Sequence, residues 1–289
     1  MDKFIDLHTH STVSDGTMTP SELVRYAKKV GLSALALTDH DTIDGVDEAL
    51  REAEKVGLEV IAGVEISADF TSTSEMHLLG YFFEGNHKRL TPLLNRLKAS
   101  REERNPKMIK KLNELGFDIS LDDVKREARD KLVGRPHIAS ALVKKGYVKN
   151  ISEAFSKYLS VGKPAYVKRE KLVPKEAIEE IVRCGGIPVL AHPIYLNITL
   201  EELYSLLYEL KKYGLEGIEA FYSDNTPHET MLFSRLAIIH NLIPTGGSDF
   251  HGDLKPNIKL GTGRGDLHVP FKVLERMKEL AKGRVKLYE

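Results

Sequence analysis

The sequence predicts an α/β fold, a sheet or barrel in which strands and helices alternate. Short apolar runs of strand length recur along the chain, and segments with the spacing of amphipathic helices separate most of them. The chain has 289 residues, of which 42% are hydrophobic and 29% charged. It is therefore long and apolar enough for one large domain or for two domains of ordinary size.

The first part of the chain supplies four of the expected strands. They are the runs at 4–8, 32–38, 58–66 and 76–83. Thr19, Pro20 and Glu22 have the pattern of a capped helix start, with an acid three residues after the cap, and a second amphipathic helix is expected over 46–57. Only about ten residues separate the third and fourth strands, which is too few for a helical crossover, so we expect an antiparallel hairpin there.

Helical patterns without interleaved strands fill the middle of the chain, from about 97 to 167. We expect a small all-helical insertion domain there. Alternation then resumes with three further strands, in IPVLAH, GIEAFY and IPTGGSD, and a last helix over about 270–282. The predicted organisation is therefore seven strands in two parts of one α/β unit, 1–96 and 168–289, on either side of an insertion at 97–167.

Composition excludes several classes of protein. The single cysteine, Cys184, rules out an intramolecular disulfide and a cysteine-rich metal site, and it fits a reducing, cytoplasmic compartment. Lys and Arg number 42, as do Asp and Glu, so the strong basic excess that accompanies binding of long duplex nucleic acid is lacking. No apolar run approaches the roughly 18 residues that would span a membrane.

Metal-binding side chains gather at the carboxyl ends of the expected strands, the rim at which α/β barrels carry their active sites. The antiparallel hairpin brings one further histidine, at the start of its strand, to the same rim. Six histidines and three carboxylates are involved: His8, His10, Asp15, His40, Glu65, His77, His192, Asp249 and His251. Nine buried polar groups without partners would be costly, and metal ions satisfy them together. Because the set offers nitrogen and oxygen only, it favours manganese, iron or zinc.

Other polar and aromatic residues leave two interpretations open. Arg135 and His137 bracket a helix start in GRPHIAS, where they would bind a phosphate or, alternatively, pair with an acid and cap the helix. Asp39 and Asp41 flank His40 and would orient imidazoles or cap the next turn.

Two aromatic residues end the sixth strand. Phe221 and Tyr222 would offer a stacking surface for a nucleobase, or they belong to the core.

The successive motifs HTHSTVSDG, TDHDTIDG, GVEIS, MHLLGY, LAHP and GSDFHG resemble those of the PHP superfamily, the polymerase and histidinol phosphatase metallohydrolases. The resemblance runs from residue 6 to 252. It implies a distorted (β/α)7 barrel and a site for three divalent ions. In that arrangement His8, His10, Glu65 and Asp249 hold the first ion, Glu65, His77 and His192 hold the second, and Asp15, His40 and His251 hold the third.

The resemblance also implies a reaction. Three carboxylates with three divalent ions leave about +3 of local charge, which attracts phosphate esters. GRPHIA within a helical insertion is similar to the branch that removes the 3′-phosphate from nucleoside 3′,5′-bisphosphates, such as pAp, and trims short oligoribonucleotides from the 5′ end. We therefore expect a phosphoric monoester hydrolase that works by attack of a metal-bound hydroxide. Glu65, Asp249 and His192 are the catalytic residues in this interpretation, and Arg135 and His137 bind the substrate's other phosphate.

Two alternatives stay open at the level of sequence. A histidinol phosphatase or generic phosphomonoesterase would share the metal ligands and differ in the insertion and in GRPH. A regulatory or structural PHP domain, of the kind appended to DNA polymerases, would not need the complete ligand set. The expected substrate is a small nucleotide with two phosphates or a short RNA.

Overall fold

A barrel-like sheet of eight strands lies at the centre of the molecule. The computed structural model describes residues 3–70, 75–83, 85–128 and 133–288. The strands are β1 (Phe4–Asp6), β2 (Ala34–Leu37), β3 (Glu59–Asp69), β4 (Glu75–Phe82), β5 (Ile187–Leu190), β6 (Gly217–Tyr222), β7 (Ile243–Gly247) and β8 (Val269–Pro270). They lie in the order β7-β6-β5-β4-β3-β2-β1-β8.

Strands β1 and β7 bring the sheet close to closure. The Leu7 amide donates to the Gly246 carbonyl at 3.2 Å, and the Asp249 amide donates to the His8 carbonyl at 2.8 Å. Seven strands thus form the wall of the barrel, as expected. The two-residue β8 adds an antiparallel partner to β1 that the sequence analysis missed, because a strand of two residues that includes a proline has no alternating pattern.

The expected hairpin is confirmed. Strands β3 and β4 pair antiparallel, with Ser67 opposite His77, and β4 also pairs antiparallel with β5. The other neighbours, β1–β2, β2–β3, β5–β6 and β6–β7, are parallel. The reversal at β4 carries the first residues of that strand to the rim at which the parallel strands end.

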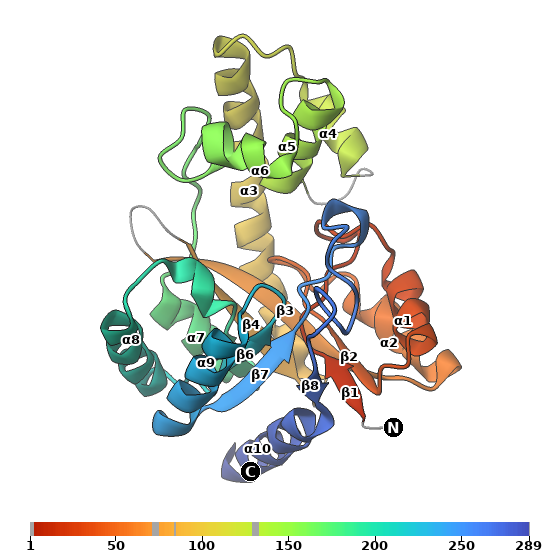
Figure 1. Ribbon diagram of the computed structural model, residues 1–289, viewed down its shortest axis with the longest axis vertical. Coiled ribbons are helices and arrows are strands. Elements are labelled where there is room, and N and C mark those ends of the chain that lie inside the picture. Colours follow the sequence, from red (N-terminus) through yellow and green to blue (C-terminus); the bar gives the residue numbers. More distant parts are fainter. Residues whose placement is uncertain (1–2, 71–74, 84, 129–132, 289) are drawn as a thin grey trace.

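Helices surround the barrel and extend above it (Figure 1). Those of the barrel are α1 (Pro20–Lys29), α2 (Val46–Val56), α7 (Pro174–Arg183), α8 (Leu200–Lys212), α9 (Pro227–Ile239) and α10 (Phe271–Tyr288). Helix α1 begins with the predicted capping box, in which Thr19 and Glu22 each accept from the other's backbone N–H. The last helix continues six residues beyond the expected end at 282.

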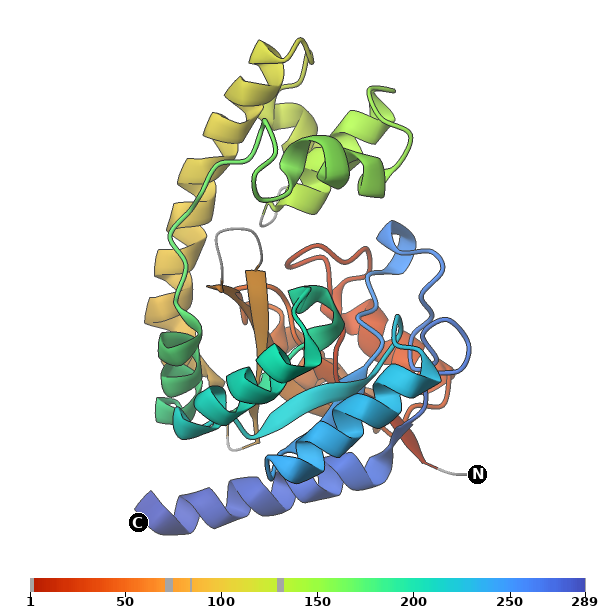
Figure 2. The ribbon, with the colours of Figure 1, turned by 60° about the vertical axis from the view of Figure 1, so that its left-hand side comes forward.

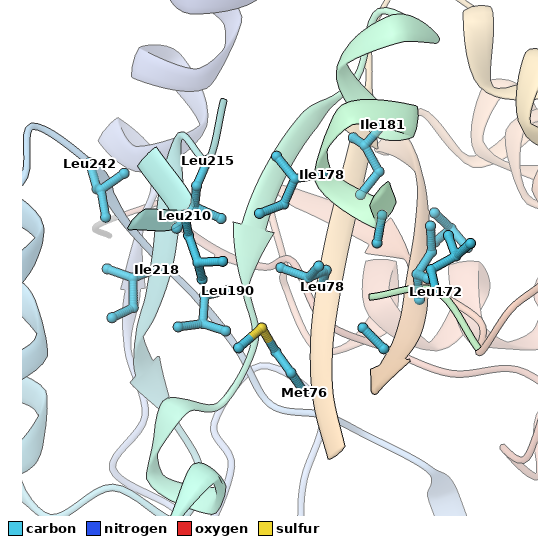
Figure 3. Close-up of a cluster of buried hydrophobic side chains, with 14 of the residues drawn as sticks. Met76, Leu78, Leu172, Ile178, Ile181, Leu190, Leu210, Leu215, Ile218 and Leu242 are labelled. Carbon is cyan, nitrogen blue, oxygen red and sulfur yellow. The ribbon is translucent and has the colours of Figure 1, made fainter. Parts of the chain in front are cut away.

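The largest core cluster packs the outer face of the sheet against the helices on one side. Figure 3 shows side chains of β4, β5, β6 and the helices beside them meeting in this layer. Met76, Leu78, Leu190 and Ile218 come from the strands, and Ile181 comes from α7. All five are fully buried. These apolar contacts fix the strands whose ends carry the polar rim.

The middle of the chain forms helices that lie over one end of the barrel (Figures 1 and 2). They are α3 (Thr91–Glu114), α4 (Leu121–Glu127), α5 (Arg135–Lys144) and α6 (Ile151–Ala154), followed by a single wide turn, η2 (Phe155–Leu159). The long helix α3 belongs to two cores: Leu94 and Leu97 pack with the barrel cluster, whereas Met108 and Leu112 pack with α4 and α5. The boundary expected at 97 therefore falls inside α3, and the domain division stays a prediction.

Candidate metal centre

Nine polar side chains converge above the barrel from the segments that follow its strands. His8 and His10 extend β1, Asp15 lies in the loop after it, and His40 follows β2. Glu65 and His77 lie on the paired strands β3 and β4, His192 follows β5, and Asp249 and His251 follow β7. The three carboxylates and the histidines His8, His10 and His251 are buried.

Glu65 lies at the middle of this group. Its Oε2 is 3.3 Å from His8 Nε2, 3.2 Å from His10 Nε2 and 2.9 Å from His40 Nδ1. Its Oε1 is 2.7 Å from His77 Nδ1 and 2.9 Å from His192 Nε2. One carboxylate therefore faces five imidazoles, an arrangement suited to bridging positively charged centres.

The two aspartates complete the group on the opposite side. Asp249 Oδ1 is 3.2 Å from His10 Nε2 and 3.3 Å from His251 Nδ1. Asp15 Oδ1 is 3.3 Å from His251 Nε2, and Asp15 Oδ2 is 3.7 Å from His40 Nε2. Asp249 and His192 have positive φ angles of 57° and 26°, so their backbone is strained where the side chains are presented.

The donor set fits divalent metal ions. Several buried atoms of these side chains have no hydrogen-bond partner: His8 Nε2, both ring nitrogens of His10, His40 Nδ1 and Glu65 Oε2. Four overlapping groups of three or four residues place one potential ligand atom each within 4.8 Å of one another. Across the described residues, these four groups together contain the nine side chains above and no others. The clusters suit a site for more than one ion.

Charge is unevenly distributed among the imidazoles. Burial opposes protonation of His8, but Glu219, Glu65 and Asp249 outweigh it and raise its pKa well above the ordinary value. Likewise, despite burial, Asp249 and Glu65 raise the pKa of His10 to about 9, and Glu65 and Glu75 raise that of His77 to about 9. Burial lowers the pKa of His251 to about 4. The environment of Glu65 therefore favours positive charge, which either protons on the imidazoles or bound metal ions can supply.

Glu219 supports the group from below, and the sequence analysis missed it. This fully buried carboxylate accepts from His8 Nδ1 at 3.0 Å and from the His192 amide at 2.7 Å. It therefore fixes which nitrogen of His8 faces the site. The signal in the sequence was a lone acid in the middle of the apolar strand GIEAFY.

Asp249 is also held by Tyr222 and Lys255, a contact that the sequence did not predict for either residue. The Tyr222 hydroxyl donates to its Oδ2 at 2.7 Å, and Lys255 Nζ donates to the same oxygen at 2.5 Å. Both contacts leave Oδ1 facing the histidines. Tyr222 is only 4% exposed and Phe221 is half-buried, so for Tyr222 the alternative of a buried residue is confirmed.

Asp39 and Asp41 do not hydrogen bond to an imidazole. Asp39 accepts from the Ser11 amide and hydroxyl, both at 2.7 Å, and from the Ser14 hydroxyl at 2.6 Å, so it holds the loop that carries Asp15. Asp41 pairs with Arg101 of α3 and with Arg169. It links the segment of the ligand His40 to the insertion.

Arg135 and His137 lie at the start of α5, above the rim. Arg135 donates to Glu75 Oε2 at 2.7 Å, and Nδ1 of His137 accepts from the Gly134 amide at 3.0 Å. These contacts are the acid pair and the helix cap that the sequence analysis gave as the alternative interpretation. A role of the two residues in phosphate binding stays a prediction.

Further cations surround this helix start. Arg101, Arg104, Arg169 and Lys171 are all nearly buried, and with Arg135 they make five positive groups. Among the described residues, the carboxylates within ion-pair distance of these groups are Asp41, Glu75 and, for Lys171, Asp69. Within the described residues Arg104 has no such partner, and its donors go to Asn105 Oδ1. Burial, with Arg101, Arg135 and Arg169 nearby, lowers the pKa of Arg104, as expected for a surplus of positive charge.

Comparison with known proteins places this site in a family. The family model described as PHP domain matches residues 6–185. A 5′-3′ exoribonuclease of Haemophilus influenzae is 41% identical over 87% of this chain and 91% of its own length. A 3′,5′-nucleoside bisphosphate phosphatase of Chromobacterium violaceum is 33% identical over 86% of this chain and 87% of its own length.

A solved structure agrees in fold. An amidohydrolase from Chromobacterium violaceum, with bound sulfate and no metal, is similar with a TM-score of 0.86 at 31% sequence identity. The match covers 95% of this chain and 96% of that one. In the described part of this chain, no helix combines the length and the apolar character that crossing a bilayer requires.

Proposed function

The chain belongs to the PHP domain family and is a metal-dependent phosphoesterase, and on this premise we propose that it removes the 3′-phosphate from nucleoside 3′,5′-bisphosphates. In the overall reaction, water and pAp give AMP and inorganic phosphate. The names of two relatives, a bisphosphate phosphatase and a 5′-3′ exoribonuclease, support this substrate class. The observation that carries the proposal is the buried cation cluster beside the rim, because it provides a place for a second phosphate.

The metal site is proposed to hold three divalent ions. His8, His10, Glu65 and Asp249 would hold the first, Glu65, His77 and His192 the second, and Asp15, His40 and His251 the third. A set of nitrogen and oxygen ligands suits manganese, iron or zinc. Bound divalent ions supply positive charge to the phosphoryl oxygens and lower the pKa of a coordinated water.

The protein's own residues position these charges. Glu65 contacts five imidazoles, and so it is the carboxylate whose loss would disturb the most ligands. Asp249 keeps Oδ1 toward the histidines because Tyr222 and Lys255 hold Oδ2. Together with His192, these are the proposed catalytic residues. Water attacks phosphorus, the bond from phosphorus to the 3′-oxygen breaks, and the leaving oxygen takes a proton.

A second phosphate fits the insertion side of the site. Arg135 and His137 lie at the first turn of α5, where backbone N–H groups and the helix dipole favour anions. The Glu75 carboxylate pairs with the Arg135 guanidinium, and a substrate phosphate would replace that carboxylate. Arg101 supports the same end of α5, because its guanidinium lies near Gly134, the residue before the helix, and its Nε is buried without a partner.

Bisphosphate hydrolysis and 5′-3′ RNA trimming break the same bond. In pAp the 3′-oxygen leaves from a phosphate monoester, and in a 5′-phosphorylated oligoribonucleotide it leaves from a diester. In both cases the insertion would bind the 5′-phosphate. A short RNA is therefore a second substrate of the same site, and the balanced net charge of the chain, with 42 basic and 42 acidic residues, argues against long duplexes.

The test is phosphate release from pAp, 3′-AMP, 5′-AMP and histidinol phosphate by chelator-stripped protein to which manganese is returned. We expect pAp to be preferred over 3′-AMP, since the two differ only in the 5′-phosphate. Arg135→Ala should abolish that preference and leave 3′-AMP turnover in place, with Arg126→Ala on the surface of α4 as the matched control. Equal turnover of pAp and 3′-AMP by the wild-type protein would contradict the bisphosphate assignment. A preference for histidinol phosphate would favour that alternative.

A separate variant tests the chemistry. Asp249→Ala should eliminate turnover of every substrate in the panel, because it removes a proposed ligand from the first ion. Full activity in an Asp249→Ala protein with verified metal content would contradict the proposed roles. Absence of turnover in the wild-type protein at any metal loading would instead favour a regulatory domain.

A further inference from the structure

We propose that Tyr195 is the stacking surface for the nucleobase of the substrate, an inference that rests on the proposed function. The sequence directed attention to Phe221 and Tyr222 for this role, but Tyr222 is buried and holds Asp249. Tyr195 is 51% exposed and lies three residues after the proposed ligand His192.

A short turn holds Tyr195 beside the metal centre. Residues Pro193–Leu196 form the turn η3, in which the Tyr195 amide donates to the His192 carbonyl at 3.1 Å. The Tyr195 ring centroid lies 5.4 Å from that of His192 and 5.8 Å from that of Tyr222, which it meets edge to face. The ring thus packs against the site, while about half of the residue's surface stays exposed.

The end of the ring is tethered as well. The Tyr195 hydroxyl donates to Asp224, and Asp224 in turn accepts from Arg264 Nε at 2.7 Å. A ring held at its backbone and at its hydroxyl loses little conformational freedom when a base stacks on it, which favours binding.

The position also matches the shape of the substrate. His77 and His192 lie side by side, with ring centroids 5.1 Å apart and both rings on Glu65 Oε1. Beyond His77 lie Glu75 and its partner Arg135, the proposed site for the 5′-phosphate. Beyond His192 lies Tyr195. A ribose with its 3′-phosphate at the metals would therefore direct its 5′-phosphate and its base toward contacts that the protein provides.

Stacking on one aromatic face makes a specific prediction about base preference. Every nucleobase has a π-face, so stacking on a tyrosine tolerates any base. The enzyme should therefore accept bisphosphates of all four nucleosides. It should favour purines modestly, because they offer more stacking area.

The first experiment compares kcat/KM for pAp with kcat/KM for a base-free analogue, 1-O-methylribose 3,5-bisphosphate. Tyr195→Ala should lower the value for pAp by roughly 5- to 150-fold, the range that alanine substitution of a stacking aromatic produces. It should leave the base-free analogue unchanged. Tyr195→Phe should retain most of the wild-type value for pAp. Tyr208→Ala is the matched control, because Tyr208 is 57% exposed on α8, where its ring lies against Lys212.

The second experiment detects stacking without turnover. A 2-aminopurine nucleoside 3′,5′-bisphosphate should lose fluorescence on binding to wild-type protein and to Tyr195→Phe, and should keep it with Tyr195→Ala. Quenching without hydrolysis would support the base site while contradicting the proposed function. An equal loss for pAp and the base-free analogue would show that Tyr195 only positions His192. That result, or unchanged kcat/KM together with unchanged quenching in Tyr195→Ala, would overturn the proposal.

Discussion

Replacing Glu219 by glutamine tests whether the metal site depends on the layer of residues beneath it. Glu219 accepts two hydrogen bonds, from His8 Nδ1 at 3.0 Å and from the His192 amide at 2.7 Å. Glutamine keeps the size of the side chain but offers only one acceptor oxygen. Its amide nitrogen must then face one of the two donors, so one ligand loses its support.

The expected magnitude follows from this geometry. Loss of a hydrogen-bond partner behind a metal-ligating histidine lowers metal affinity or activity by about 10- to 100-fold, which corresponds to roughly 1.4–2.7 kcal/mol. Since both His8 and His192 contact Glu65, the disturbance reaches two of the proposed ion positions. We therefore expect the upper part of that range.

The assay is a competition for manganese between the protein and a chelator of known affinity, followed by kcat/KM for pAp at saturating metal. Glu209→Gln on the exposed surface of α8 is the matched control and should behave as wild type. Glu219→Gln with wild-type metal affinity and wild-type kcat/KM would refute the reasoning. Circular dichroism should show that both variants are folded.

The remaining predictions concern the junction with the insertion and the closure of the barrel. Asp41→Asn should lower the free energy of unfolding by roughly 3–5 kcal/mol in a urea titration, because it leaves Arg101 and Arg169 buried without their carboxylate. Burial opposes ionisation of Asp41, but Arg169 and Arg101 outweigh it and hold its pKa below the ordinary value of about 3.9. The stabilisation by ionised Asp41 is thus complete above its ordinary pKa and is lost as the pH falls through the pKa of the folded protein. The difference in unfolding free energy between wild type and Asp41→Asn should therefore disappear only in acid. A difference that disappears between pH 8 and 6 would contradict this. Gly247→Ala should abolish metal binding or folding, as measured by metal content and circular dichroism, because a Cβ there would lie 2.3 Å from the His8 amide nitrogen, and a stable, metal-replete variant would show that β1 and β7 can separate without loss.

The motifs that end the strands predicted much of the fold and the site. Each delivers its ligands within a few residues, as in HTH after β1 and SDFH after β7, so local sequence and strand order together were enough to bring nine residues to one rim. The position of His77 also followed from the sequence, because the short connection required an antiparallel pair.

The residues that support the site could not be predicted in the same way. Glu219 reaches His8 over 211 positions of sequence and Tyr222 reaches Asp249 over 27, and no local pattern marks them apart from an acid in an apolar strand. Asp41 meets Arg169 over 128 positions of sequence. Such pairs depend on how separate segments of the chain pack together, which propensity and spacing do not determine.

If several ions held by these nine side chains carry out phosphoester hydrolysis, activity should follow the number of ions bound. Protein stripped by chelator is given manganese in steps of less than one equivalent, and pAp hydrolysis and bound metal are measured at each step. We expect no activity without metal, little at the first equivalent, and a maximum near three ions per chain, the number proposed above for these nine side chains. Full activity in the presence of chelator, or a maximum at a single equivalent, would contradict this expectation.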